Sequence, residues 1–410
     1  MNSLLKPEHK KIDFWYGLLI SAFCFSLPFE GVARAVPNII LIPLLVLFPF
    51  TIKRESFKNW YWRPIVLYAI LWVSLLVKTF VFGQFESEMG FLTKLLLVSA
   101  IFFLMTPVNS MSWVKKGLVY GTTAAILLSF GAVIGYIIES GHFKFSSGPQ
   151  VNSVLVTERV YLAFLAVISS VFCFNETTEE EKKAKKSLYL AILLINVLFI
   201  LMVAARMATI SLIVIGVFYF IFKKRYKQLL YFGAAALALL FVAIISNPNL
   251  KNRIFYADKK KNFVEKVQAW EPRVVIWGCT FSSLSDTDFN YLFGFASSNE
   301  VQGKLLECYD ESIEREGKRD YFLREKFNPH NQYFDILLLT GFLGLFLFGG
   351  IFFDLLRCNR HNFTNLALIL SFLLLGLVEC YLHRQLGVYI FGVLCIVALK
   401  KTKKNYLTEE

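Results

Sequence analysis

Long apolar runs follow one another along most of this chain, and short polar segments separate them. A membrane-spanning helix needs about 20 mostly apolar residues, so each run of roughly that length predicts one crossing. The pattern predicts about twelve spanning helices, at residues 13–28, 36–52, 64–82, 90–106, 113–138, 154–174, 187–204, 207–222, 228–246, 332–356, 363–380 and 385–399. The expected fold class is therefore all-α, a polytopic membrane protein.

The apolar run over residues 187–222 decides the number of crossings. It is too long for one crossing, and Arg206 interrupts it, so we predict a helical hairpin with almost no loop. With this hairpin, about 23 lysines and arginines flank the spans on the side of both termini, and about five lie on the other side. Because basic residues gather in cytoplasmic loops, both termini are predicted to be cytoplasmic.

The composition agrees with a membrane protein, since 56% of the residues are hydrophobic and 16% are aromatic. A soluble protein of this size could not expose so much apolar surface to water. The formal net charge of +13 would suggest a nucleic-acid partner in a soluble protein. Here the basic residues lie beside the spans, so we expect contacts with membrane lipids and none with nucleic acid.

One hydrophilic segment, residues 247–331, is far longer than the other connections and is predicted to lie outside the cytoplasm. Its opening, residues 246–270, has a helical pattern, and Pro272 is a plausible first residue of another helix. We therefore expect a large, mainly helical periplasmic loop between spans 9 and 10. The predicted parts are spans 1–9 (1–246), the loop (247–331), and spans 10–12 with a cytoplasmic tail (332–410).

Two residue pairs in this loop raise questions of chemistry. Cys279 and Cys308 could form a disulfide if the loop lies in an oxidising compartment. Asp286 and Asp288 form a DxD sequence, which holds a metal and a nucleotide-sugar in many soluble glycosyltransferases. We interpret both aspartates as turn residues instead, and expect no metal site.

Two arginines are candidates for binding an anion. Arg206 interrupts an apolar run, where a charge costs roughly 2.5–3.5 kcal/mol, so it faces either a polar cavity with an anion or the lipid headgroups. Arg273 follows the helix-starting Pro272 and could bind phosphate together with the free N–H groups of that helix end. The alternative for Arg273 is a surface salt bridge with Glu271.

Other charged residues near the span ends are open to two readings. Arg159, Arg384 and His383 could line the same outer vestibule and bind substrate, or they could mark the membrane interface. Lys78 and Lys94 lie inside apolar runs near span ends, and we expect their side chains to reach the headgroups.

His330 lies in an NPHN turn where the long loop enters a span. The turn could use it as a helix cap, which is the structural interpretation. Imidazole titrates near neutrality and can accept a proton from a hydroxyl. Two arginines and one histidine at one membrane surface suit a diphosphate leaving group and an alcohol nucleophile.

Three short motifs resemble the O-antigen ligase and polymerase superfamily, integral-membrane glycosyltransferases of the GT-C type. They are ARMATIS at residues 205–211, PRVVIWG at 272–278 followed by YLFGFA at 291–296, and NPHNQYFDILLLTGFLGL at 328–345. The resemblance also covers the arrangement of about twelve spans with one large periplasmic loop.

The resemblance implies a multi-pass enzyme of the bacterial inner membrane that needs no cofactor or metal. In that family the donor is a glycan on undecaprenyl diphosphate, and the ligases transfer it to a hydroxyl of the lipid A-core oligosaccharide. The resemblance implies that this transfer inverts the configuration of the anomeric carbon. Carried over to this chain, Arg206 and Arg273 would hold the diphosphate, and His330 would orient or deprotonate the acceptor hydroxyl.

We favour a ligase, because all three ligase-like motifs occur together. The alternative is a polymerase of the same superfamily, whose acceptor is a second lipid-linked glycan. A third interpretation is a transporter of lipid-linked glycans. Transporters tend to have repeated halves and helices broken at the midplane, whereas the prolines of this chain lie mostly at span ends.

Overall fold

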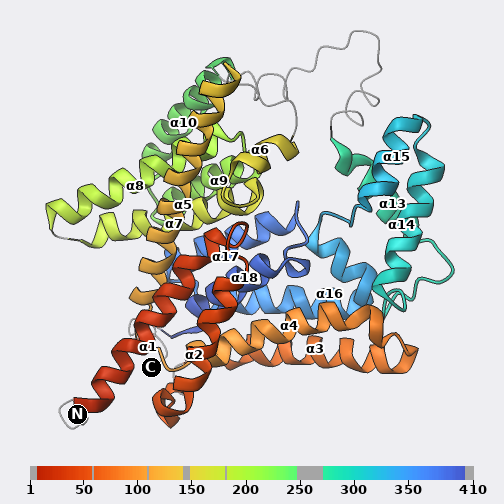
Figure 1. Ribbon diagram of the computed structural model, residues 1–410, viewed down its shortest axis with the longest axis horizontal. Coiled ribbons are helices and arrows are strands. Elements are labelled where there is room, and N and C mark those ends of the chain that lie inside the picture. The colour runs from red at the N-terminus through yellow and green to blue at the C-terminus, as the bar shows by residue number, and fades with distance from the viewer. Residues whose placement is uncertain are drawn as a thin grey trace.

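The computed structural model describes residues 7–57, 60–108, 110–141, 148–180, 182–246 and 271–401. Within these ranges the chain is helical and has no β-strand, only isolated bridges (Figure 1). The helices are α1 (Pro7–Ser26), η1 (Leu27–Phe29), α2 (Ala35–Thr51), η2 (Arg54–Phe57), α3 (Trp62–Phe82), α4 (Phe85–Met105), α5 (Ser112–Ser140), α6 (Gly148–Val154), α7 (Arg159–Glu179), α8 (Lys183–Met202), α9 (Arg206–Phe222), α10 (Tyr226–Ser246), α13 (Pro272–Ser283), α14 (Ser298–Ser312), α15 (Glu316–Glu325), α16 (Gln332–Cys358), α17 (Phe363–Gly376), η3 (Tyr381–His383) and α18 (Gln385–Leu399).

The expected all-helical membrane protein is confirmed. Each predicted span overlaps one of these helices, and seven of the described helices are long and apolar enough to cross a membrane by length and composition. The number of crossings stays a prediction. The predicted interruption of the long apolar run is present, because α8 ends at Met202 and α9 begins at Arg206, with residues 203–205 between them.

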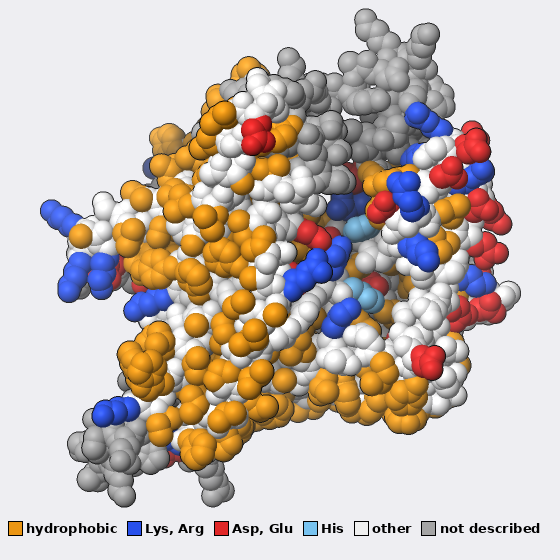
Figure 2. Space-filling view, in the orientation of Figure 1, with side chains coloured by type: hydrophobic (Ala, Val, Ile, Leu, Met, Phe, Trp, Pro, Cys, Tyr) orange, Lys and Arg blue, Asp and Glu red, His pale blue; other side chains and the backbone are white. Residues whose placement is uncertain are grey.

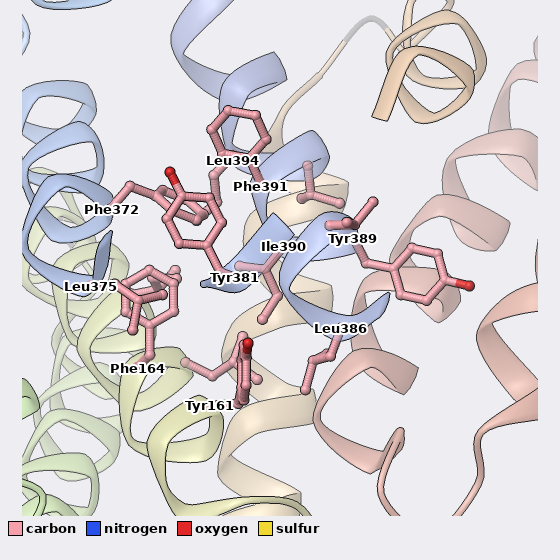
Figure 3. Close-up of a cluster of buried hydrophobic side chains, with 14 of the residues drawn as sticks. Tyr161, Phe164, Phe372, Leu375, Tyr381, Leu386, Tyr389, Ile390, Phe391 and Leu394 are labelled. Atoms are coloured by element: carbon pink, nitrogen blue, oxygen red, sulfur yellow. The ribbon is translucent and has the colours of Figure 1, made fainter. Parts of the chain in front are cut away.

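A buried cluster joins α7 to the three last elements of the chain (Figure 3). Phe164 of α7 packs edge-on against Phe372 of α17, with ring centroids 5.0 Å apart, and Phe372 contacts Tyr381 of η3. Most side chains of α18 are buried, in keeping with a helix that is apolar on all sides. This packing fixes the turn between α17 and α18, which carries several site residues.

Helix α16 is broken at Gly341, and the long loop fills the break. Gly341 has φ +62°, and a Cβ at this position would lie 2.4 Å from the backbone of Leu292, so the site requires glycine. The amide of Phe342 donates to the carbonyl of Tyr291 at 2.8 Å, and the amide of Phe295 donates to the carbonyl of Leu338 at 2.9 Å. The loop therefore supplies hydrogen bonds that the broken helix lacks.

Lys78 of α3 forms a hydrogen bond at this break, although we predicted that its side chain reaches the lipid headgroups. Its side chain is buried, and the ammonium donates to the carbonyl of Leu339, just before Gly341. An ammonium bound to a protein carbonyl does not extend to lipid headgroups, so the interpretation of Lys78 was wrong. The open carbonyl of a broken helix is a better partner for a buried cation than distant water.

Helices α13, α14 and α15 form the described part of the long loop and lie together at one end of the molecule (Figure 1). Helix α13 begins at Pro272, as predicted. A disulfide between Cys279 and Cys308 joins α13 to α14. The helix predicted over residues 246–270 falls almost wholly outside the described residues, as do residues 402–410 of the predicted tail.

Candidate functional site

Arg206 is the first residue of α9 and follows a very tight turn. Ala204 in this turn has φ +49°, a conformation that L-residues adopt at a cost, so the change of direction between α8 and α9 is abrupt. Nη2 of Arg206 lies 2.7 Å from Oε2 of Glu271, at the end of the long loop. The partner anion expected for Arg206 is thus a carboxylate of the protein itself.

Arg273 binds the same carboxylate from a different helix. It is the second residue of α13, and its Nη1 lies 2.9 Å from Oε1 of Glu271. Burial alone would raise the pKa of the Glu271 carboxyl, but the guanidiniums of Arg273 and Arg206 hold that pKa below its usual value. The predicted salt bridge of Arg273 with Glu271 is therefore present, and it is shared with Arg206.

A cleft between α7, α9 and α17 contains these arginines. Arg159, Arg206 and Arg273 all line it, together with Ala204, Ala205, Ala208 and Val378. Small alanine side chains leave space in front of the guanidiniums. Figure 2 shows acidic, basic and histidine side chains gathered in a hollow between the loop helices and the rest of the molecule.

His330 lies beside this cleft without lining it. Its backbone has φ +46°, and its amide donates to Oδ1 of Asn328 at 3.0 Å, so the NPH turn is tightly fixed. The cap of α16 is Asn331, which accepts from the amides of Tyr333 and Phe334, so the capping interpretation of His330 was wrong. The imidazole of His330 therefore does not cap α16.

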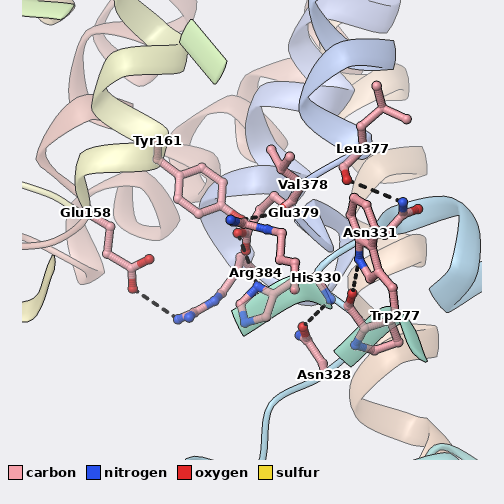
Figure 4. Close-up of polar contacts among 12 residues, drawn as sticks. Glu158, Tyr161, Trp277, Asn328, His330, Asn331, Leu377, Val378, Glu379 and Arg384 are labelled. Carbon is pink, nitrogen blue, oxygen red and sulfur yellow. Dashed lines mark hydrogen bonds and ion pairs between the residues drawn. The ribbon is translucent and has the colours of Figure 1, made fainter. Parts of the chain in front are cut away.

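One short turn, residues 377–379, lies beside His330 (Figure 4) and also contacts Arg273. Nη2 of Arg273 donates to the carbonyl of Val378 at 3.1 Å, and Nδ2 of Asn331 donates to the carbonyl of Leu377 at 3.3 Å. Oε2 of Glu379 lies 3.8 Å from Nδ1 of His330. The structure thus brings the three predicted residues into one neighbourhood through this turn.

The side chains of Arg384 and His383 have protein partners of their own. Nη1 of Arg384 lies 3.1 Å from Oε1 of Glu158, and both side chains are about half exposed. Nε2 of His383 lies 2.9 Å from Oδ2 of Asp335, and its ring stacks on Phe91. Neither residue lines the arginine cleft.

Sequence reasoning assigned no role to two buried carboxylates. Asp335, in the first turn of α16, and Glu379, before η3, are both almost fully buried. Each lies next to a histidine, His383 and His330 respectively. A carboxylate inside or beside an apolar span is costly, and that cost is the signal that could have identified them.

The DxD aspartates have the role of turn residues, as interpreted. The amide of Asp288 donates to Oδ1 of Asp286, and both carboxylates bind the ammonium of Lys304, at 2.8 and 2.9 Å. Lys304 lowers the pKa of the Asp286 carboxyl by hydrogen bonding to it. Among the described residues, no group of three or more His, Cys, Asp and Glu side chains could hold a metal ion.

Comparison with known proteins gives one family. The family model described as O-antigen ligase matches residues 190–349, a range that contains α9, the described loop helices and the first part of α16. All three motifs singled out in the sequence lie within it. No curated protein matches the chain. Residues 190–349 therefore belong to the O-antigen ligase and polymerase superfamily of membrane-bound, glycosyltransferase-like enzymes.

Proposed function

We propose that this protein is an O-antigen ligase of lipopolysaccharide biosynthesis. It would transfer a glycan from undecaprenyl diphosphate to a hydroxyl of the lipid A-core oligosaccharide, without a metal ion. The observation that carries the proposal is the convergence of Arg206 and Arg273 on one carboxylate in a shared cleft. Two guanidiniums that together hold one anion are suited to a diphosphate.

In this proposal the arginines stabilise the leaving group. As the bond between the sugar and the diphosphate breaks, negative charge grows on the departing phosphate oxygens. Fixed guanidiniums beside those oxygens stabilise the transition state more than the ground state, which is the condition for catalysis. The donor displaces Glu271, whose carboxylate is only 19% exposed and is in contact with both arginines.

An apolar cleft next to the arginines supports a lipid-linked donor. It is lined by α7, α8, α9 and α10 and extends along α9 from Thr209 to Phe220, and Arg206 begins the same helix. Its lining includes Leu193 of α8 and Phe232 of α10. A diphosphate at the N-terminus of α9 would direct its polyprenyl chain into this cleft.

The acceptor hydroxyl would approach His330 from the open side of the hollow. The side chain of His330 is 26% exposed, so an acceptor can reach it. His330 would take the hydroxyl proton while the oxygen attacks the anomeric carbon opposite the leaving diphosphate, which inverts the configuration. Arg159 lies in the donor cleft, whereas Arg384 and His383 lie on the acceptor side in this proposal.

The disulfide supports the proposed orientation. Disulfides persist in the periplasm and are rare in the bacterial cytoplasm, so the bond between Cys279 and Cys308 favours a periplasmic loop. Together with the distribution of basic residues, it supports an inner-membrane protein with both termini in the cytoplasm.

Complementation of a deletion strain tests the ligase against the polymerase. Loss of a ligase leaves finished polymer on the undecaprenyl carrier, whereas loss of a polymerase leaves lipid A-core capped by a single unit. We expect the deletion strain to show the first pattern on a lipopolysaccharide gel. The wild-type chain should restore ligation, and Arg206→Ala should not. Arg324→Ala, an exposed arginine of α15, is the matched control and should restore ligation. A core capped by one unit would favour the polymerase.

A further inference from the structure

Glu379 is a buried carboxylate with poor hydrogen bonding. Its side chain is 9% exposed, and it lies in the turn between α17 and η3. Oε1 is 3.5 Å from the hydroxyl of Tyr161, at the limit of a hydrogen bond, and Oε2 is 3.8 Å from Nδ1 of His330. Burying a carboxylate without strong partners is costly, so its position requires a reason.

Nδ1 of His330, which faces Glu379, also lacks a good hydrogen-bond partner. Nδ1 is buried and has no hydrogen-bond partner among the described residues. A charge-assisted hydrogen bond has its atoms about 2.7–2.9 Å apart, so a closure of roughly 1 Å would satisfy both groups at once. The carbonyls of Leu377 and Val378 are already bound, by Asn331 and Arg273, so a side-chain rotation of Glu379 is the simplest way to close this gap.

The exposed part of the His330 ring lies away from Nδ1. The side chain as a whole is 26% exposed, whereas Nδ1 is buried. A hydrogen bond from Nδ1–H to Glu379 would leave Nε2 without a proton and open to an acceptor hydroxyl. The tautomer of a catalytic histidine is set by the partner of its other nitrogen.

We propose that Glu379 is a positioning residue that holds His330 in the tautomer able to act as the base. The inference rests on the proposed function. As the acceptor oxygen bonds to the anomeric carbon, its proton passes to Nε2, and the electron pair of the broken sugar–phosphate bond leaves with the diphosphate. Glu379 stays ionised and stabilises the imidazolium that results.

Other charged groups around this pair are themselves engaged. Arg384 is paired with Glu158, Asp335 with His383, and Arg273 with Glu271. The titratable groups close to Glu379 are Tyr161 of α7 and the buried Cys380. Glu379 is therefore the group able to favour a charged His330.

The test is Glu379→Gln in the purified full-length protein, assayed with a lipid-diphosphate donor across a range of pH. We expect kcat to fall about 100-fold, the donor KM to change less than about threefold, and the acidic limb of the pH–rate profile to move to lower pH. The last effect follows because loss of the negative charge disfavours the imidazolium. A purely structural role for Glu379 would not move that limb.

Two further variants make the result decisive. Glu379→Asp keeps the charge and should retain at least about tenfold more activity than Glu379→Gln, with an acidic limb near that of the wild type. Tyr161→Phe removes the other neighbour of the carboxylate and should lose less than about threefold in kcat. Equal activity of the Asp and Gln variants, or a wild-type kcat and profile for Glu379→Gln, would overturn the inference. If His330→Ala were active, His330 could not be the base, and the proposed function would fail at that point. This failure is therefore distinguishable from a failure of the role of Glu379.

Discussion

Replacing Glu271 by Gln should strengthen donor binding. Glu271 places one carboxylate oxygen 2.7 Å from Arg206 and the other 2.9 Å from Arg273. If the donor diphosphate binds these guanidiniums, it must first displace this carboxylate. Gln keeps the size of the side chain and removes its charge, so the competition weakens.

The magnitude follows from the two contacts. A hydrogen bond to a charged group is worth about 1.5–3 kcal/mol when both partners stay out of water. The side chains of Arg206 and Arg273 are 36% and 26% exposed, so water recovers much of that energy when Glu271 leaves. We expect a net gain of roughly 1–2 kcal/mol, which is a donor KM about 5–30-fold lower.

The assay is steady-state glycan transfer by purified protein at varied donor concentration. Glu325→Gln, an exposed glutamate of α15 that contacts Arg324, is the matched control and should leave KM unchanged. A raised or unchanged KM in Glu271→Gln would show that Glu271 only orients the arginines and that the donor does not compete for them.

Three further predictions concern stability. Lys78→Met leaves the carbonyl of Leu339 without its buried donor and should cost about 1–3 kcal/mol, seen as a lower Tm of the purified protein. Cys279→Ser combined with Cys308→Ser removes a bond across 29 residues and should cost roughly 3–4 kcal/mol, so proteases should cut the loop sooner. The pKa of Glu271 is lowered, so its ion pairs contribute fully above the ordinary value of 4.5 and are lost as the pH falls through the lower folded-state value. The Tm difference between the wild type and Glu271→Gln should therefore be constant from pH 5 to 7 and shrink below about pH 4. An unchanged Tm in Lys78→Met, equal proteolysis, or a Tm difference independent of pH would contradict these predictions in turn.

Sequence reasoning predicted the helices well because hydrocarbon imposes a simple rule. An apolar run of about 20 residues must form a helix to satisfy its backbone in lipid. The same rule located the tight turn between Met202 and Arg206, since a run of this length is too long for one spanning helix. These inferences need no knowledge of tertiary contacts.

The break in α16 at Gly341 could not be predicted from the hydrophobic pattern. Gly341 is non-helical because the loop around Leu292 approaches its backbone and supplies the missing hydrogen bonds. A contact between residues so far apart in the chain leaves no periodic signal. The misinterpretation of Lys78 has the same origin, because its partner, the carbonyl of Leu339, is open only at this break.

The candidate site was predictable in part. Arg206 was recognisable because a cation inside an apolar run needs an anion, and Arg273 because it follows a helix-starting proline. Their meeting at Glu271, and the approach of Glu379 to His330, depend on how α9, α13 and the turn after α17 pack together. Which residues share a cleft is a property of packing, and local sequence does not encode it.

Glycan transfer by the purified protein tests the central claim most directly. The assay would use a defined undecaprenyl-diphosphate glycan as donor, lipid A-core as acceptor, and EDTA throughout. We predict transfer by the wild type, loss of at least about 100-fold in Arg206→Ala, Arg273→Ala and His330→Ala, and full activity in Arg324→Ala. Near-normal transfer by Arg206→Ala or Arg273→Ala would contradict the account, because the diphosphate would then be held elsewhere.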